Sequence, residues 1–281
     1  MNRVSAKDLF EKRGDEPIVM VAAYDAPSAE ILDDVADIIL VGDSVGNTRL
    51  GYDDTLPVTL DESLSHTAAV ARGSERAMVV GDMPFASFGV STERSAENAA
   101  RYLKEAGAQA VKLETPVEGG VSVETVRRMT ELGVPVMGHV GLTPQQVHRK
   151  GYKVQGRDEE EADAILERAR ELEEAGVFSV VLESVPESLG ARVTDALGVP
   201  TIGIGAGREV DGQVLVLDDL VGLSDGTPTF VKEYADVRGV MTDAVKEYAK
   251  EVREGEFPSD EHIFGDSRDS KDDDTDGGDD R

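Results

Sequence analysis

The sequence predicts a (β/α)8 barrel, and two observations lead to that prediction. Eight short runs rich in apolar and β-branched residues recur along the 281 residues, and helical patterns separate most of them. Within each run the apolar residues are continuous, which is typical of parallel strands covered on both faces. Eight such strands with intervening helices favour a closed barrel. An open, doubly wound sheet is the alternative that the pattern leaves.

The predicted elements follow one another in a regular order. Two helical patterns are clear, at 91–107 and 158–176, because each begins at a Ser or Asp that can cap a helix and ends at Gly. The segment 266–281 holds eight Asp and cannot form a packed core, so we expect a barrel domain over 1–265 and then a disordered acidic tail. The predicted strands are 17–25, 37–44, 77–84, 108–115, 134–142, 178–185, 200–207 and 213–223.

The chain is strongly acidic, with a formal net charge of -28 at pH 7. This charge argues against binding to nucleic acid, which requires a basic surface. Only 10 of the 29 basic residues are Lys. An acidic surface poor in Lys suits a cytoplasm of molar salt, where screening removes the self-repulsion. We therefore expect a halophilic protein; an acidic mesophilic protein is the alternative.

Nothing in the sequence suggests secretion or a membrane. The first residues, MNRVSAKDLFEKRGDEP, lack the apolar core of a signal peptide, and no run of about 18 apolar residues occurs. The chain also has no Cys, which excludes disulfides and thiolate chemistry. We expect a cytoplasmic protein that acts on small molecules.

Four carboxylates stand at the ends of predicted strands: Asp43, Asp82, Glu114 and Glu183. In a (β/α)8 barrel the strand ends share one rim, where active sites are built. A single Asp in such a place can simply cap the next turn or helix. Because four strands show the same feature, we expect these side chains to lie together at the rim.

A cluster of carboxylates requires a positive partner, because like charges repel. Only His139 of the four His stands at a predicted strand end, so a zinc site is disfavoured. Oxygen ligands favour a hard cation, and Mg²⁺ is the usual choice when carboxylates are few and water and substrate complete the octahedron. Asp43, Asp82 and Glu114 are therefore candidate ligands, directly or through water.

Two of the carboxylates differ in their surroundings. Lys112 precedes Glu114 by two residues and so lies on the same side of its strand, whereas Val181 takes that place before Glu183. A nearby ammonium favours the ionised carboxylate, and apolar surroundings raise its pKa. We therefore predict that Glu114 is a metal ligand and that Glu183 is a general base.

Several motifs resemble the ketopantoate hydroxymethyltransferase family in order and spacing. They are VGDSVG, DMPF, VKLE, PVMGHVGLTPQ, GYKVQGR, VLESVP, IGIGAG followed by DGQVLVLDD, and EHIF, and the resemblance covers about residues 5–264. It implies a barrel of the phosphoenolpyruvate mutase/isocitrate lyase type and a homo-oligomer, typically a decamer, with one Mg²⁺ per subunit. It also implies transfer of a hydroxymethyl group from 5,10-methylenetetrahydrofolate, or a related pterin, to 3-methyl-2-oxobutanoate. The product, 2-dehydropantoate, leads to pantothenate and coenzyme A.

The resemblance also implies roles for individual residues. Glu183 matches the family's proton acceptor, and Asp43, Asp82 and Glu114 match its Mg²⁺ ligands. A Mg²⁺-dependent 2-oxo acid lyase or mutase of the related barrel group is the closest alternative, and a non-catalytic barrel is a more distant one. The residues that the resemblance assigns to keto-acid binding are Asp43, Ser44, Asp82, Lys112 and His139.

Overall fold

The computed structural model of the chain describes residues 3–264. Its internal contacts divide the chain into two compact units, Met1–Ala235 and Asp236–Arg281. All eight strands belong to the first unit. The acidic tail predicted for 266–281 lies outside the described residues, and the predicted domain boundary at residue 265 stays a prediction.

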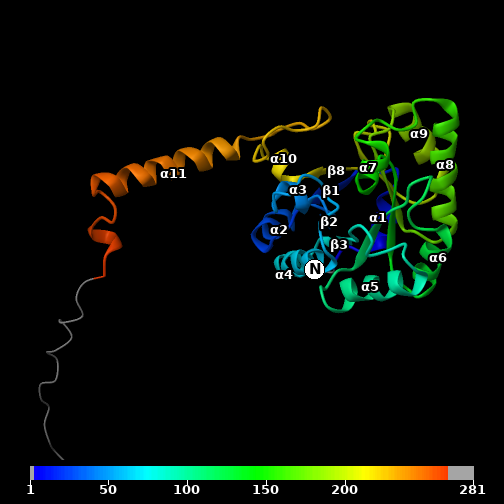
Figure 1. Cartoon of the computed structure of the whole chain (residues 1–281), viewed down its shortest axis with the longest axis horizontal. Coiled ribbons are helices and arrows are strands. Elements are labelled where there is room, and N and C mark those ends of the chain that lie inside the picture. Colours follow the sequence, from blue (N-terminus) through cyan, green and yellow to red (C-terminus); the bar gives the residue numbers. More distant parts are fainter. Residues whose placement is uncertain (1–2, 265–281) are drawn as a thin grey trace, which may run out of the picture. The chain divides into compact units, whose positions relative to one another are not determined.

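The first unit is a closed barrel of eight parallel strands that pair in sequence order, β1 with β2 and so on to β8 with β1. This confirms the predicted (β/α)8 barrel and excludes the open sheet. Figure 1 shows the strands of this unit with helices around them. The strands are β1 Ile18–Ala22, β2 Ile38–Val41, β3 Met78–Asp82, β4 Ala110–Glu114, β5 Val136–Gly141, β6 Ser179–Glu183, β7 Thr201–Ile204 and β8 Gly212–Val216.

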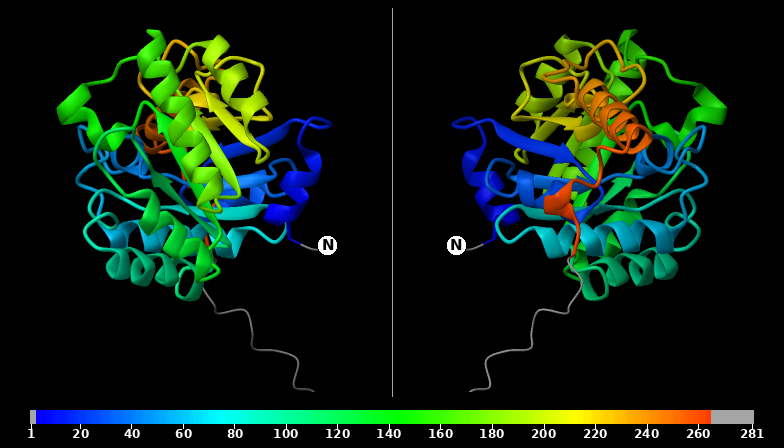
Figure 2. Two further views of the ribbon diagram at one scale, coloured as in Figure 1. Left: turned by 90° about the vertical axis from the view of Figure 1, so that its right-hand side faces the viewer. Right: turned by 90° about the vertical axis from the view of Figure 1, so that its left-hand side faces the viewer.

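Several of the helices begin at a short polar side chain that caps them. Ser91 Oγ accepts the backbone N–H of Arg94 at the start of α5, and Asp158 accepts that of Glu161 at the start of α8. Neighbouring helices α4 and α5 lie side by side outside the strands (Figures 1 and 2). The helices of the first unit are α1 Ala6–Lys12, α2 Ala26–Leu32, α3 Val45–Thr48, α4 Leu60–Gly73, α5 Thr92–Lys104, α6 Val123–Glu131, α7 Val147–Lys150, α8 Glu159–Glu174, α9 Glu187–Ala196 and α10 Leu217–Leu220, with a 3-10 turn, η1, at Pro144–Gln146.

The last predicted strand was too long. The structure ends β8 at Val216 and begins α10 at Leu217, where the sequence predicted a strand over 213–223. The run QVLVLDDLVGL is apolar on average, but its two Asp fall where α10 turns, and Asp218 forms an ion pair with Arg49 there. Apolar content alone does not separate a short strand from a strand that continues as a helical turn.

The barrel interior is filled by apolar side chains that recur at every second strand position. Met20 of β1, Met78 of β3 and Met137 of β5 belong to one buried cluster, together with Leu9 of α1. Residues of the opposite parity, such as Val79, pack outward against the helices. This period of two decides which residues near each strand end also point inward.

Asp33, which follows α2, holds the loop that leads into β3. Its carboxylate accepts hydrogen bonds from the hydroxyl of Ser74 and from the backbone N–H groups of Glu75, Arg76 and Ala77. Burial alone would raise the pKa of Asp33, but these hydrogen bonds outweigh it and lower that pKa to about 2.

The Asp33 carboxylate should therefore stabilise the fold above pH 4 and lose this effect as the pH falls towards 2. The sign follows because the unfolded chain takes up the proton first, near its ordinary pKa of 3.8. After allowance for solvent screening, we expect Asp33→Asn to remove roughly 1 kcal/mol at pH 6 and almost nothing at pH 2. Urea unfolding between pH 2 and 6 measures this difference in the free energy of unfolding. Substitution of the exposed neighbouring residue, Asp34→Asn, is the control. A pH-independent difference between Asp33→Asn and the wild type would contradict it.

The second unit contains helix α11, Val237–Glu254, and the turn η2, Asp260–His262. Asp236 caps α11 by accepting the backbone N–H of Gly239, and Gly255 ends it in the left-handed conformation. Among the described residues, no helix is long and apolar enough to cross a membrane.

Candidate functional site

The predicted site residues meet at the carboxyl-terminal rim of the barrel. Asp82, Lys112, His139 and Glu183 each follow an inward apolar residue by two positions, so they form the next inward layer above the apolar interior. Glu114 continues the same parity on β4. Strand pairing sets Asp82 beside Lys112, and Glu114 beside His139. The charged layer therefore rests directly on the hydrophobic core.

The cation of this layer pairs with Asp82. Lys112 Nζ lies 2.6 Å from Asp82 Oδ2, and both side chains are buried. Asp82 Oδ1 is also buried but has no hydrogen-bond partner. Burial acts to lower the pKa of Lys112, but the surrounding carboxylates raise it, and the charge of Asp82 has the largest effect among them. The ammonium is thus retained, and one carboxylate oxygen beside it is left without a partner.

Asp43 and Glu114 are tied by a residue to which the sequence assigned no role. Gln145, in η1, donates its backbone N–H to Glu114 Oε2 at 2.9 Å. Its side-chain Nε2 donates to Asp43 Oδ2 at 2.8 Å and to the backbone carbonyl of Met83 at 3.0 Å. Gln145 is the last residue of the motif PVMGHVGLTPQ, but its amide carries no charge that would mark it as part of a site.

The site is too negative for its single ammonium. Three buried carboxylates against Lys112 leave a formal charge of -2 when all are ionised. Burial, and then the charge of Asp82, raises the pKa of Asp43 to about 7. Burial and the charge of Asp43 raise the pKa of Glu114 well above its ordinary value. Lys112 acts to lower the pKa of Glu114, as the sequence predicted, but burial and the charge of Asp43 outweigh this effect.

The donor set fits a divalent cation of the hard type. It consists of carboxylate oxygens, one of them the unpartnered Asp82 Oδ1, and the -2 charge equals that which such an ion would neutralise. Over residues 3–264, no three His, Cys, Asp or Glu side chains are grouped so as to hold a metal ion together. Direct binding through all three carboxylates would thus require a rearrangement of these side chains.

Ser44 follows Asp43 and stands at the start of α3. Its hydroxyl lies 2.8 Å from the hydroxyl of Tyr24, which is buried. Burial raises the pKa of Tyr24, so its phenol stays protonated and can hold the Ser44 hydroxyl in place. Tyr24 was not among the predicted residues; it follows β1, whose predicted run ended in the unremarkable triplet AYD.

Glu183 and His139 form the other side of the site. Glu183 Oε2 lies 3.3 Å from His139 Nε2, and the side chain of Glu183 is 17% exposed. His139 is buried, and neither of its ring nitrogens makes a hydrogen bond. The carboxylate is thus mostly withdrawn from solvent, as its apolar neighbour Val181 predicted, but still reachable from the rim.

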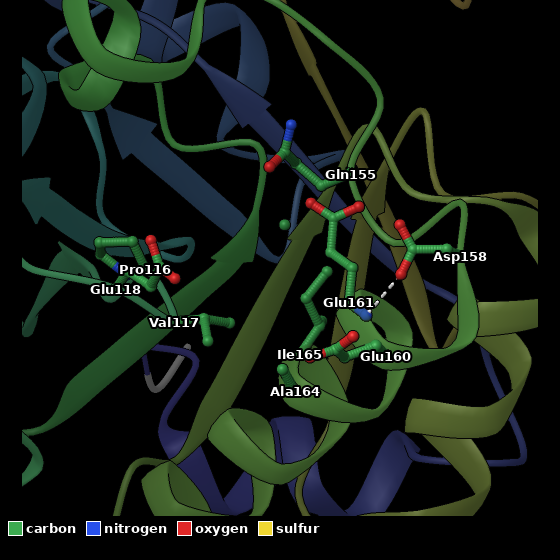
Figure 3. A pocket seen from close by; sticks show the side chains of 10 residues that line it. Pro116, Val117, Glu118, Gln155, Asp158, Glu160, Glu161, Ala164 and Ile165 are labelled. Atoms are coloured by element: carbon green, nitrogen blue, oxygen red, sulfur yellow. Dashed lines mark hydrogen bonds between the residues drawn. The ribbon is translucent and has the colours of Figure 1, made fainter.

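A pocket of about 370 Å³ lies beside these strand ends (Figure 3). Strand pairing sets its Gly141 beside Glu183, and the backbone N–H of its Gln155 donates to the carbonyl of Ser184. No basic side chain lines it, so it suits a neutral or cationic group better than a keto acid. Its lining residues are Pro116, Val117, Glu118, Gly141, Gln155, Asp158, Glu160, Glu161, Ala164 and Ile165.

Comparison with known proteins agrees with the fold and the motifs. A 3-methyl-2-oxobutanoate hydroxymethyltransferase of Natronomonas pharaonis is 57% identical over 258 residues, which cover 92% of this chain and 95% of the relative. One of Haloarcula marismortui is 54% identical over 259 residues, with the same coverage. Among solved structures, 2,3-dimethylmalate lyase, a PEP mutase/isocitrate lyase superfamily member, has a TM-score of 0.57 at 16% identity, covering 91% of this chain and 98% of that one. The family model of ketopantoate hydroxymethyltransferase matches residues 3–260, and the chain therefore belongs to that family.

Proposed function

We propose that the protein transfers a hydroxymethyl group from 5,10-methylenetetrahydrofolate, or a related pterin, to 3-methyl-2-oxobutanoate. The product would be 2-dehydropantoate, a precursor of pantothenate and coenzyme A. Family membership supports the reaction type. The observation that carries the proposal is the buried layer at one barrel end, where a carboxylate cluster of charge -2 faces the mostly buried base candidate Glu183.

The reaction requires removal of a weakly acidic proton from C3 of the keto acid. We assign the role of proton acceptor to the Glu183 carboxylate, which ends β6, whereas the three clustered carboxylates lie on or after β2, β3 and β4. The Lys112 ammonium would stabilise the enolate oxygen, because it is the cation that belongs to this buried layer. Ser44 would hold the carboxylate end of the substrate, and Asp82 would keep Lys112 aimed at it.

Asp43 and Asp82 would hold one Mg²⁺ per subunit, with Glu114 bound directly or through water. When bound, the cation would supply Lewis-acid polarisation of the keto acid. The imidazole of His139 lies against Glu183 and would line the keto-acid pocket, where it restricts the rotamers open to the base.

The proposed function is tested by following the C3 proton of 3-methyl-2-oxobutanoate by NMR in D₂O with molar KCl. We expect Mg²⁺-dependent loss of the C3–H signal, which a chelator prevents. Addition of 5,10-methylenetetrahydrofolate should then yield 2-dehydropantoate. Absence of exchange with and without a pterin would refute the keto acid as substrate, and pterin-independent cleavage of a 2-oxo acid carbon–carbon bond would favour the lyase alternative.

We further propose that the protein is a homo-oligomer, a decamer, in the cytoplasm of a halophilic organism. The large negative charge and the scarcity of Lys support the halophilic assignment. On helix α11, Val240, Met241, Val245, Tyr248 and Val252 recur at helical spacing and form an apolar side of the kind that a second subunit covers. Light scattering in molar KCl measures the mass of the assembly, and a monomer would contradict the proposal.

A further inference from the structure

Gln145 connects the ends of consecutive barrel strands. Its side-chain Nε2 donates to the carboxylate of Asp43 after β2 and to the backbone carbonyl of Met83 after β3. Its backbone N–H donates to the carboxylate of Glu114 at the end of β4. The residue itself lies beyond β5 and is 5% exposed. The side-chain amide makes two of these bonds and the backbone N–H makes the third, so the buried residue is held in one orientation and fixes the carboxylates to which it donates.

The same contacts limit how each carboxylate can bind a cation. Gln145 occupies Asp43 Oδ2 and Glu114 Oε2, and Lys112 occupies Asp82 Oδ2. An oxygen that accepts an N–H shares its negative charge with that donor, so it binds a metal ion more weakly than an oxygen without one. Each of the three carboxylates therefore offers one oxygen that is weakened in this way and one on which no N–H is seen.

One-oxygen binding discriminates between the common divalent cations. Mg²⁺ takes six ligands in an octahedron and keeps several waters, so carboxylates that offer one oxygen each suit it. Ca²⁺ takes six to eight oxygens and often binds a carboxylate through both of them. A site in which every carboxylate has one oxygen occupied by an N–H thus favours the smaller ion.

We propose that Gln145 is a positioning residue that determines the selectivity of the site for Mg²⁺ over Ca²⁺. It does so by weakening one oxygen of Asp43 through Nε2, while its backbone N–H does the same for Glu114. The inference rests on the proposed divalent-cation site. It concerns the side-chain amide alone, because the backbone N–H persists in any substitution except proline.

The test measures binding of Mn²⁺ to the full-length protein by electron paramagnetic resonance, followed by displacement with Mg²⁺ or with Ca²⁺. Gln145→Met keeps the length of the side chain and removes its donor. We expect Mg²⁺ to bind about 10-fold more weakly, a usual effect of losing a group that orients a ligand. Ca²⁺ should lose less or gain, because Asp43 can then offer both oxygens. The ratio of the two dissociation constants should shift by about 10-fold towards Ca²⁺.

Gln146→Met is the matched control, since its side chain bonds to Arg149 and touches no carboxylate of the site. A Gln145→Met variant whose Mg²⁺ and Ca²⁺ affinities fall equally, or not at all, would overturn the selectivity role. If that variant does not fold, Gln145→Glu serves instead: it places an oxygen where the amide nitrogen was, and it should shift the ratio further towards Ca²⁺. Wild-type protein that binds no Mn²⁺ would refute the proposed cation site itself, which is a different result.

Discussion

Glu183→Gln should slow exchange of the C3 proton of 3-methyl-2-oxobutanoate by about 10²–10⁴-fold, the usual effect of removing a general base. The amide has the shape of the carboxylate but cannot accept the proton at neutral pH. Binding of the keto acid should change little, because the charged and hydroxyl groups assigned to hold it lie after β2 and on β3 and β4. NMR in D₂O measures the exchange rate, and titration of the keto acid against the exchange rate separates binding from proton removal.

The control for this variant is Glu187→Gln. Glu187 is the first residue of α9, half exposed, and pairs with Arg208 away from the site. Exchange that continues at the wild-type rate in Glu183→Gln would move the base elsewhere, and His139 would be the next residue to substitute, since it lies 3.3 Å from Glu183. Loss of exchange in both variants would point to a general effect on the barrel end.

Lys112→Met should destabilise the metal-free protein by about 3–5 kcal/mol, the range found when one partner of a buried ion pair is removed. Asp82 would lose its ion-pair partner, and Asp43 and Glu114 would lose the positive charge that now lies among the three carboxylates. Because the remaining carboxylates can escape this repulsion by taking up protons, the loss should be smaller at pH 5 than at pH 8. Urea unfolding in a chelator, at both pH values, gives the two free energies.

Lys7→Met is the comparison for a lysine of the surface. Lys7 pairs with Glu11 across one turn of α1, and both are exposed, so its removal should change the free energy of unfolding by about 0.5 kcal/mol or less. Mg²⁺ should recover part of the stability lost in Lys112→Met, since it supplies positive charge to the same oxygens. Equal effects of the two substitutions would show that the buried pair adds nothing to the stability of the fold.

The barrel could be predicted because each strand is short, apolar and buried on both sides, which leaves a continuous signal in the sequence. Five predicted residues of the candidate site follow the same regularity, since they share the inward parity of their strands: Asp82, Lys112, Glu114, His139 and Glu183. Alternation along one strand does not predict which side chains of neighbouring strands pair with each other. Lys112 stands two residues before Glu114, yet its ammonium pairs with Asp82, because the register places these two residues side by side.

Loop residues behave differently, because the strand period does not set the direction of their side chains: Asp43 was predicted from its place after an apolar run, whereas Gln145 was not predicted. Asp43 lies beyond the end of β2, where the inward positions are Ile38 and Leu40, so its direction depends on the turn and not on the strand period. Gln145 reaches the site only because η1 folds over the ends of the preceding strands. The strand period therefore predicts the direction of neither Asp43 nor Gln145, and the amide of Gln145 carries no charge that would mark it in the sequence.

The apolar layer beneath the candidate site closes the barrel interior, so the site opens only towards the carboxyl-terminal rim. Met20, Met78 and Met137 fill its interior, and Leu9 of α1 packs into the same cluster. Water and protons therefore have no route through the floor, because a close-packed core has no channel of molecular width. A proton taken by Glu183 must leave through the rim. Whatever covers the rim during turnover then decides whether that proton is returned to the substrate or lost to the solvent.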